Sequence, residues 1–358
     1  MNIDQTNLSA EQRTIAIQRL SALWAFTESG LGGIMHALQM PFTGLIVGAM
    51  SIIMISFIAQ LSADRYKEIL KSLLIVLIIK AMVSPYTPFP AYIAVAFQGL
   101  MGFALFKLLR VNPVSILLLS IITMLESAIQ QLLILTLFFG QSIWAATDAF
   151  VAAIAKQFDI RAINGSKWII TVYLLIYILG AVATSWLAWK TLTAFATSKI
   201  NELGTDEIFK NEIPLETVRR KKNTTLKIWV ITSLLIICSV IMYFIAADAK
   251  QGWIAVAKTV SWTLSAIVLW YMLINPIFTK LIKKLLQKNR GRYSEEVSGI
   301  LSFLPVLRQL TAMAWRKSKL QKAGGRWHVF LTELIRSSLT YNDQQAKPAA
   351  GATFKKTA

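Results

Sequence analysis

The sequence predicts an all-α, polytopic integral membrane protein with about eight transmembrane helices and with both ends of the chain in the cytoplasm. Its 358 residues are 55% hydrophobic, with a mean hydropathy of +0.56. Charged residues make up 15% of the chain, against about 25% in soluble domains. Apolar stretches of about 20 residues recur, which is the length of helix that crosses a hydrocarbon core of about 30 Å. The ten-residue alternating strands of an outer-membrane barrel are not seen.

The apolar stretches place the membrane spans in order along the chain. The third is short, and it either leans in the membrane or pairs with the proline-rich segment that follows it. The expected spans are residues 20–40, 43–60, 72–84, 91–109, 114–139, 168–189, 228–246 and 257–278.

Basic residues set the orientation, because Lys and Arg accumulate in cytoplasmic loops. With the N-terminus inside, 31 of the 37 basic residues fall in cytoplasmic segments. The net charge of +19 is therefore explained as an insertion signal and as an attraction to anionic lipid, and not as a nucleic-acid surface. The bacterial inner membrane is the expected location.

The chain divides into a larger membrane unit and a basic C-terminal part. Residues 300–317 carry apolar positions on one side. They form either an amphipathic helix on the inner membrane surface or a cytoplasmic hairpin with Trp327 to Leu339. The expected divisions are a cytoplasmic N-terminus (1–19), a six-helix membrane unit (20–189), a basic cytoplasmic linker (190–227), a two-helix membrane hairpin (228–278), a basic helical region (279–341) and a disordered tail (342–358).

Enzyme signatures are missing from the sequence. It has no GxGxxG, Walker, HExxH or GxSxG motif. Its single cysteine, Cys238, excludes an internal disulfide framework, and two histidines are too few for a multi-histidine metal site. We expect no catalytic residue, no metal and no cofactor, and an intramembrane enzyme is the least favoured class.

Polar residues inside the first span are the main candidates for a functional site, because ionisable groups are costly in a bilayer. At 100° per residue, Glu28, Gly32, His36 and Gln39 share one face of a helix. A ladder of small residues beside them favours close helix packing. Its members are Ser21, Ala25, Ser29 and Gly33, and the second span repeats the device with Gly44 and Gly48. The alternative is that Glu28 and His36 only hold helices together.

Two other spans carry polar groups. Glu126 and Gln130 lie one turn apart in the fifth span, and Lys80 lies near the outer end of the third. Lys80 either extends outward to water or pairs with a carboxylate, and Glu126 either faces Glu28 or pairs with Lys80. Residues 84–90 contain three prolines and no charge, and they form either a cap over a ligand cavity or a stiff turn.

A family resemblance covers residues 20–189. The run from Glu28 to Gly33, followed by Pro41-Phe42-Thr43-Gly44 and Gly48, resembles the opening of the substrate-binding S components of energy-coupling-factor vitamin transporters. The closest branch is that of heptaprenyl-diphosphate-synthase component I or Gx transporters. The resemblance implies a six-helix fold that binds a vitamin from the outer side. It also implies that the small-residue ladder docks onto a membrane-protein partner.

Together these observations predict small-solute membrane transport by an S-component-like protein. Its ligand- or ion-binding residues are predicted to be Glu28, His36, Gln39, Lys80, Glu126 and Gln130. The alternative is a non-catalytic subunit of a larger inner-membrane assembly that uses the polar stripe for helix packing or proton movement.

Overall fold

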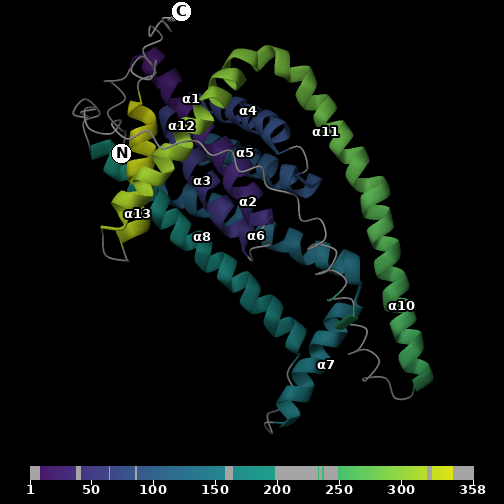
Figure 1. The fold of residues 1–358 in the computed structure, drawn as a ribbon. Coiled ribbons are helices and arrows are strands. Elements are labelled where there is room, and N and C mark those ends of the chain that lie inside the picture. The colour runs from purple at the N-terminus through teal and green to yellow at the C-terminus, as the bar shows by residue number, and fades with distance from the viewer. Residues whose placement is uncertain are drawn as a thin grey trace, which may run out of the picture.

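The fold was analysed in a computed structural model, which describes residues 9–37, 42–63, 65–84, 87–157, 164–197, 233, 236–237, 249–320 and 325–341. Every regular element in these residues is a helix, which confirms the all-α class (Figure 1). Gln39 and most of the seventh predicted span, 228–246, lie outside the described residues. The same holds for most of the linker, for Cys238 and for the tail from residue 342.

The first helical run and the two helices that follow it form the centre of the bundle. The first helical run starts ten residues before the predicted span, because Ser9 and Gln12 form a capping box that begins the helix there. It passes without a break through a π-helical turn. The elements are α1 (Ala10–Phe26), the π-helix η2 (Thr27–Leu31), α2 (Gly32–Ala37), α3 (Thr43–Leu61) and α4 (Lys67–Val83). α3 and α4 both pack on α1, and their buried faces hold most of the largest buried side chains.

The next helices surround this centre. α6 packs on α3, α5 and α8, and α8 also packs on α3. Asn112 caps α6 through the backbone N–H of Ser115, with Pro113 in the first turn. The elements are α5 (Phe89–Leu109), α6 (Pro113–Phe139), α7 (Ser142–Gln157) and α8 (Gly165–Thr197). α8 runs eight residues beyond the predicted end of the sixth span.

Helix α7 was not predicted, since residues 140–167 were taken as an outer connection. Asp148 of α7 accepts a hydrogen bond of 2.7 Å from the backbone N–H of Ser166 in the first turn of α8. That hydrogen bond, with Lys167 close by, holds the pKa of Asp148 below its ordinary value. A carboxylate at a helix N-terminus is favourable, so this contact fixes α7 against the start of α8.

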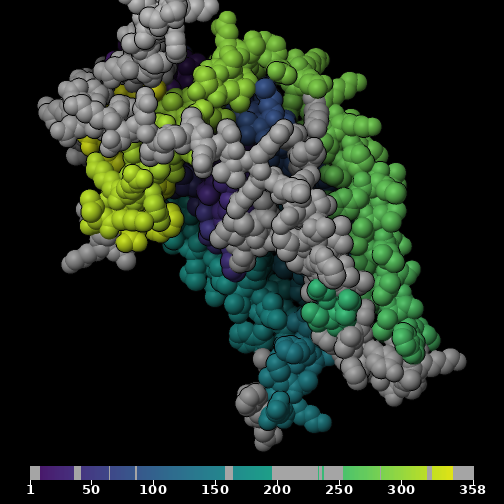
Figure 2. Space-filling model, in the orientation of Figure 1, coloured from purple at the N-terminus to yellow at the C-terminus, as the bar shows by residue number. Residues whose placement is uncertain are grey.

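The C-terminal part forms a long helical arm and a hairpin. The arm runs along one flank of the molecule and bends over one end of the bundle (Figures 1 and 2). The elements are α10 (Ala249–Val268), the π-helix η4 (Leu269–Ile274), α11 (Asn275–Arg290), the 3₁₀ turn η5 (Gly291–Tyr293), α12 (Ser294–Ser318) and α13 (Arg326–Thr340). The eighth predicted span, 257–278, lies within this arm.

The structure distinguishes the two alternatives for residues 300–317. α12 and α13 pack against each other, and both contact α1. The rings of Trp315 and Phe330 meet edge to face at 5.6 Å, and Lys317 and Glu333 form an ion pair of 2.7 Å. The apolar side of α12 is therefore buried within the protein. Residues 300–317 form half of a hairpin and not a helix that lies free on a surface. Burial and the nearby Lys190 lower the pKa of His328, where α13 meets α8.

Among the described residues, five helices are long and apolar enough to cross a membrane, so the chain is a membrane protein. They include α3, α5, α6, α8 and the arm. On α8, Trp168 and Trp186 are both exposed, and their separation along the helix is roughly 27 Å. Tryptophan is enriched at both membrane interfaces, and Lys190 lies 4.8 Å from the Trp186 ring. The positions of these residues match those of interfacial anchors at the two ends of a membrane span.

The orientation is tested by reporter fusions in cells. We expect a cytoplasmic signal from a reporter placed after Asn223 or at Ala358, and an outer signal from one near Asp148 or Lys250. The reason is the distribution of basic residues. A cytoplasmic signal at Asp148 would contradict the six-span unit.

A close helix contact in the bundle is tested at Gly102. A Cβ atom at this position would lie 2.5 Å from Cγ2 of Ile55 in α3. We expect Gly102→Ala to lower the free energy of unfolding by about 1–3 kcal/mol, because the packed helices must separate. The control is Gly299→Ala in α12, where a Cβ meets nothing within 4 Å. Equal melting temperatures of the two purified variants would show that α3 and α5 are not closely packed.

Candidate functional site

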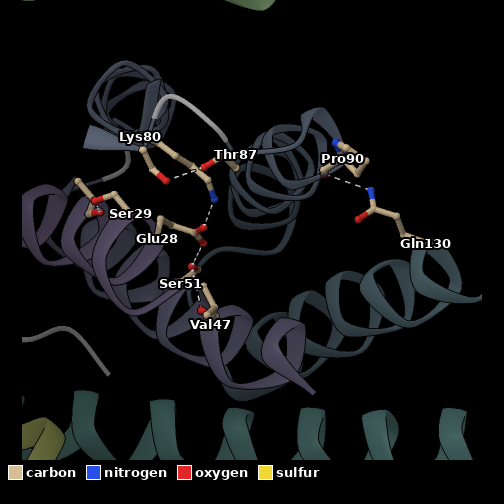
Figure 3. A network of polar contacts seen from close by, with 10 residues as sticks. Glu28, Ser29, Val47, Ser51, Lys80, Thr87, Pro90 and Gln130 are labelled. Atoms are coloured by element: carbon tan, nitrogen blue, oxygen red, sulfur yellow. Dashed lines mark hydrogen bonds and ion pairs between the residues drawn. The ribbon is translucent and has the colours of Figure 1, made fainter. Parts of the chain in front are cut away.

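A buried ion pair joins the first and third predicted spans. Nζ of Lys80 in α4 donates to Oε2 of Glu28 at 2.7 Å (Figure 3). Both side chains are almost fully buried, at 5% and 3% exposure. The other carboxylate oxygen, Oε1, accepts a hydrogen bond of 2.6 Å from the hydroxyl of Ser51 in α3. Both oxygens of this carboxylate are therefore satisfied, and three helices meet at it.

This geometry answers two questions that the sequence left open. Lys80 does not extend outward to water, because its ammonium group turns inward to Glu28. Glu126 is not its partner. A lysine near the end of a span can also extend to water at the membrane surface. Pairing inside the protein is preferred only when the hydrogen-bonding geometry of the two charges is good, as it is here.

Glu28 lies in the π-helical turn η2, which interrupts the first helix. Such turns occur often at functional sites. Thr27 and Ser29, on either side of Glu28, bond to carbonyl oxygens one turn back with their hydroxyl groups. The hydroxyl groups supply donors to these carbonyl oxygens where the helical pattern changes, so the backbone around Glu28 stays satisfied inside the bundle.

One face of the first helical run contacts α3. Glu28 faces Ser51, and Gly32 faces Val47 one turn earlier on α3. The predicted shared face of Glu28 and Gly32 is thus the contact with α3. His36 is the last residue but one of α2, and its side chain lies outside the described residues.

The small-residue ladder lies largely within the chain, with Gly33 half-buried. The hydroxyl of Ser21 bonds to Ser72 of α4 at 2.8 Å, and Gly33 lies beside the hydroxyl of Ser84. Ala25 and Ser29 are also buried. The docking role that the resemblance implies for this ladder stays a prediction. The ladder packs α1 against α4, and the reason is that small side chains let two helices of one chain approach closely.

One face of α3 is bordered by polar side chains along its length. Ser51, Gly48 and Gly44 lie on this face at successive turns. Ser51 contacts Glu28, Gly48 lies beside the amide nitrogen of Gln98, and Gly44 lies beside Ser127 and the hydroxyl of Tyr177. Since neither glycine has a side chain, the polar groups of α5, α6 and α8 approach the backbone of α3 directly.

Two buried oxygens, one in α5 and one in α6, have no hydrogen-bond partner among the described residues. They are Oε1 of Gln98 and Oε2 of Glu126, the residue next to Ser127. A buried acceptor without a donor is unfavourable by about 1–3 kcal/mol. These atoms mark places where a bound donor, such as a solute group or a water molecule, would be stabilising.

Gln130 does not contact the Glu28–Lys80 pair, with which it was predicted to form one binding site. Its amide nitrogen donates to the carbonyl oxygen of Pro90 at 3.2 Å, in the first turn of α5 (Figure 3). The bond satisfies a carbonyl oxygen and ties α6 to α5. Near it, Thr87 bonds to Ser84 within the proline-rich segment. Gln130 thus holds the start of α5 in place. The partners of the Glu28 carboxylate are Ser51 and Lys80.

An aromatic group lies at the start of α3. Phe42 has a φ angle of 60°, which is rare for a bulky residue and is maintained only by its surroundings. Its ring stacks on Tyr173 at 6.0 Å, and the hydroxyls of Tyr173 and Tyr177 bond to each other. These tyrosines and Ser51 were missed by sequence reasoning. The spacing of four residues between the two tyrosines in α8 was the available signal.

Comparison with protein-family models, with curated proteins and with solved structures gave no match to this chain. The interpretation of the site therefore depends on its own geometry.

The buried pair is tested by removing one charge. We expect Lys80→Met to lower the free energy of unfolding by about 3–5 kcal/mol, because it leaves the Glu28 carboxylate buried without a cation. The double variant Glu28→Gln/Lys80→Met should recover most of this loss. Thermal unfolding of the detergent-solubilised protein measures both.

The matched control is Lys317→Met, which breaks the other 2.7 Å ion pair where the lysine is 59% exposed. We expect a change of about 0–1 kcal/mol there. If Lys80→Met melts like Lys317→Met, the Glu28 site is open to water and the buried pair does not exist.

Proposed function

We propose that this protein binds a small solute within the bilayer and takes part in its transport across the bacterial inner membrane, as an S-component-like protein over residues 20–189. The observation that carries the proposal is the buried Glu28–Lys80 pair on a π-helical turn. An ionisable residue inside a membrane helix is costly, and it is by default a candidate for a substrate or ion path.

The surroundings of the pair support a solute-binding role. The face of α3 formed by Gly44, Gly48 and Ser51 leads from the pair toward the aromatic group at Phe42. Oε1 of Gln98, beside Gly48 on this face, is a buried acceptor without a donor among the described residues, and Oε2 of Glu126 in α6 is another. Sites for small polar ligands combine apolar walls with a few fixed polar groups, and this region has both.

The pair also indicates the class of solute. A solute with an anionic group would bind Lys80, and its donors would bind the carboxylate of Glu28 or the free oxygens of Gln98 and Glu126. In this exchange an internal ion pair is replaced by ion pairs with the ligand, so no buried charge is left uncompensated. A compact zwitterionic solute, with a carboxylate for Lys80 and a cationic N–H group for Glu28, fits these requirements.

The Glu28 contacts also favour a second function. Both carboxylate oxygens already have partners within the chain. A pair that is satisfied in this way is also what a non-catalytic subunit of a larger assembly needs to fix its helices. In this alternative a membrane-protein partner covers the exposed apolar side of α8 or of the arm, and the pair takes no part in transport.

The experiment is mass spectrometry of small molecules that co-purify with the full chain in detergent. We expect a solute to be retained by the wild-type protein and to be lost from Glu28→Gln/Lys80→Met, which keeps the fold by replacing both charges at once. The matched control Glu333→Gln/Lys317→Met makes the same two changes in the hairpin and should retain the solute.

Retention of the same solute by the Glu28→Gln/Lys80→Met variant would contradict the site. A wild-type protein that carries no solute beyond lipid and detergent, but that co-purifies with a stoichiometric membrane protein, would favour the second function.

A further inference from the structure

A small cavity opens at the end of the bundle where the chain begins. It lies between α1, the connection from α3 to α4, and α4, and its volume is about 70 Å³. The hydroxyls of Ser21 and Ser72, which bond to each other at 2.8 Å, form part of its lining. This cavity is separate from the Glu28–Lys80 pair, which lies about two turns further along α1 and α4.

Positive charge dominates the lining. Arg13, Arg65 and Lys71 contribute three cations, and Glu68 contributes the one carboxylate among the lining residues. Lys71 also pairs with Glu296 of α12 at 3.0 Å. The side chain of Arg65 is exposed at the rim, where it is free to reorient toward a ligand.

The cavity lies at the level of a membrane surface. The first and third predicted spans begin at residues 20 and 72, next to Ser21 and Ser72. Arg13, Arg65 and Lys71 precede these positions, so they lie on the side where basic residues predict the cytoplasm. Phosphate groups of anionic lipids and of soluble metabolites both reach basic side chains at this depth.

We propose that this cavity binds a phosphate group. Arginine and lysine bind phosphate oxygens through charge-assisted hydrogen bonds, and hydroxyl groups contribute further contacts. The volume accommodates one tetrahedral anion and is well below the 300–1,000 Å³ of a site for a whole cofactor. The phosphate belongs either to a lipid headgroup that enters from the bilayer or to a soluble phosphate compound.

The test uses the purified full chain in a zwitterionic detergent with two probes. One is inorganic phosphate, compared with chloride at equal ionic strength. The other is dioctanoyl phosphatidic acid, compared with dioctanoylglycerol, which has the same acyl chains without the phosphate. Isothermal titration calorimetry measures the dissociation constants. We expect saturable binding of at least one phosphate probe at one site per chain.

The variant is Arg65→Gln, and the matched control is Lys67→Gln, which removes an exposed positive charge from the same end of α4 without lining the cavity. We expect Arg65→Gln to weaken binding about tenfold and Lys67→Gln less than about twofold. Arg65→Lys keeps the charge and should restore part of the affinity. Gel filtration checks that each variant is folded.

Binding of phosphatidic acid alone assigns the cavity to a lipid headgroup, and binding of inorganic phosphate assigns it to a soluble ligand. The proposal is overturned if neither probe binds saturably, if dioctanoylglycerol binds as tightly as phosphatidic acid, or if Arg65→Gln and Lys67→Gln weaken binding equally. The last result would mean that the phosphate group is attracted to the basic surface as a whole and not to this cavity.

Discussion

The ion pair between Glu28 and Lys80 determines how the centre of the bundle is arranged. It joins α1 to α4, and the Ser51 hydroxyl brings α3 to the same carboxylate. Between apolar helices in a bilayer there is little hydrophobic driving force, so polar contacts and close packing decide which faces meet. The register of α1 against both neighbours follows from this one site. The buried Ser21–Ser72 contact and the glycines of α3 are consistent with the same register.

Much of the fold was predictable from the sequence, because runs of apolar residues report directly on membrane helices. The spans at 43–60, 91–109 and 114–139 agree with α3, α5 and α6 to within a few residues. Helix α7 and the early start of α1 were missed, since both are less apolar and α1 depends on a cap at Ser9. The hairpin of α12 and α13 was one of two alternatives, because an amphipathic face fits a membrane surface and a protein neighbour equally well.

The candidate site was predictable only as a set of residues on separate helices. Sequence position gives the depth of Glu28 and Lys80 in their spans, but it does not say which helices are neighbours, so their pairing stayed open. Small residues were recognised at Gly44 and Gly48, whereas the closest contacts are at Gly165, Gly102, Gly180 and Gly99. A glycine pattern shows that close approach is allowed, and the partner side chain decides how close it becomes. Ser51 and Gln98 gave no signal, because single neutral polar residues are common in membrane helices.

The hairpin of α12 and α13 has a consequence for biosynthesis. The guanidinium group of Arg19 lies 3.9 Å from the ring of Phe303, so one end of the first helix is covered by a segment that the ribosome makes nearly 300 residues later. At about 5–20 residues per second, this delay is some tens of seconds. During that time the start of α1 lacks its native neighbour on this side, and the contact forms only after translation has passed α12.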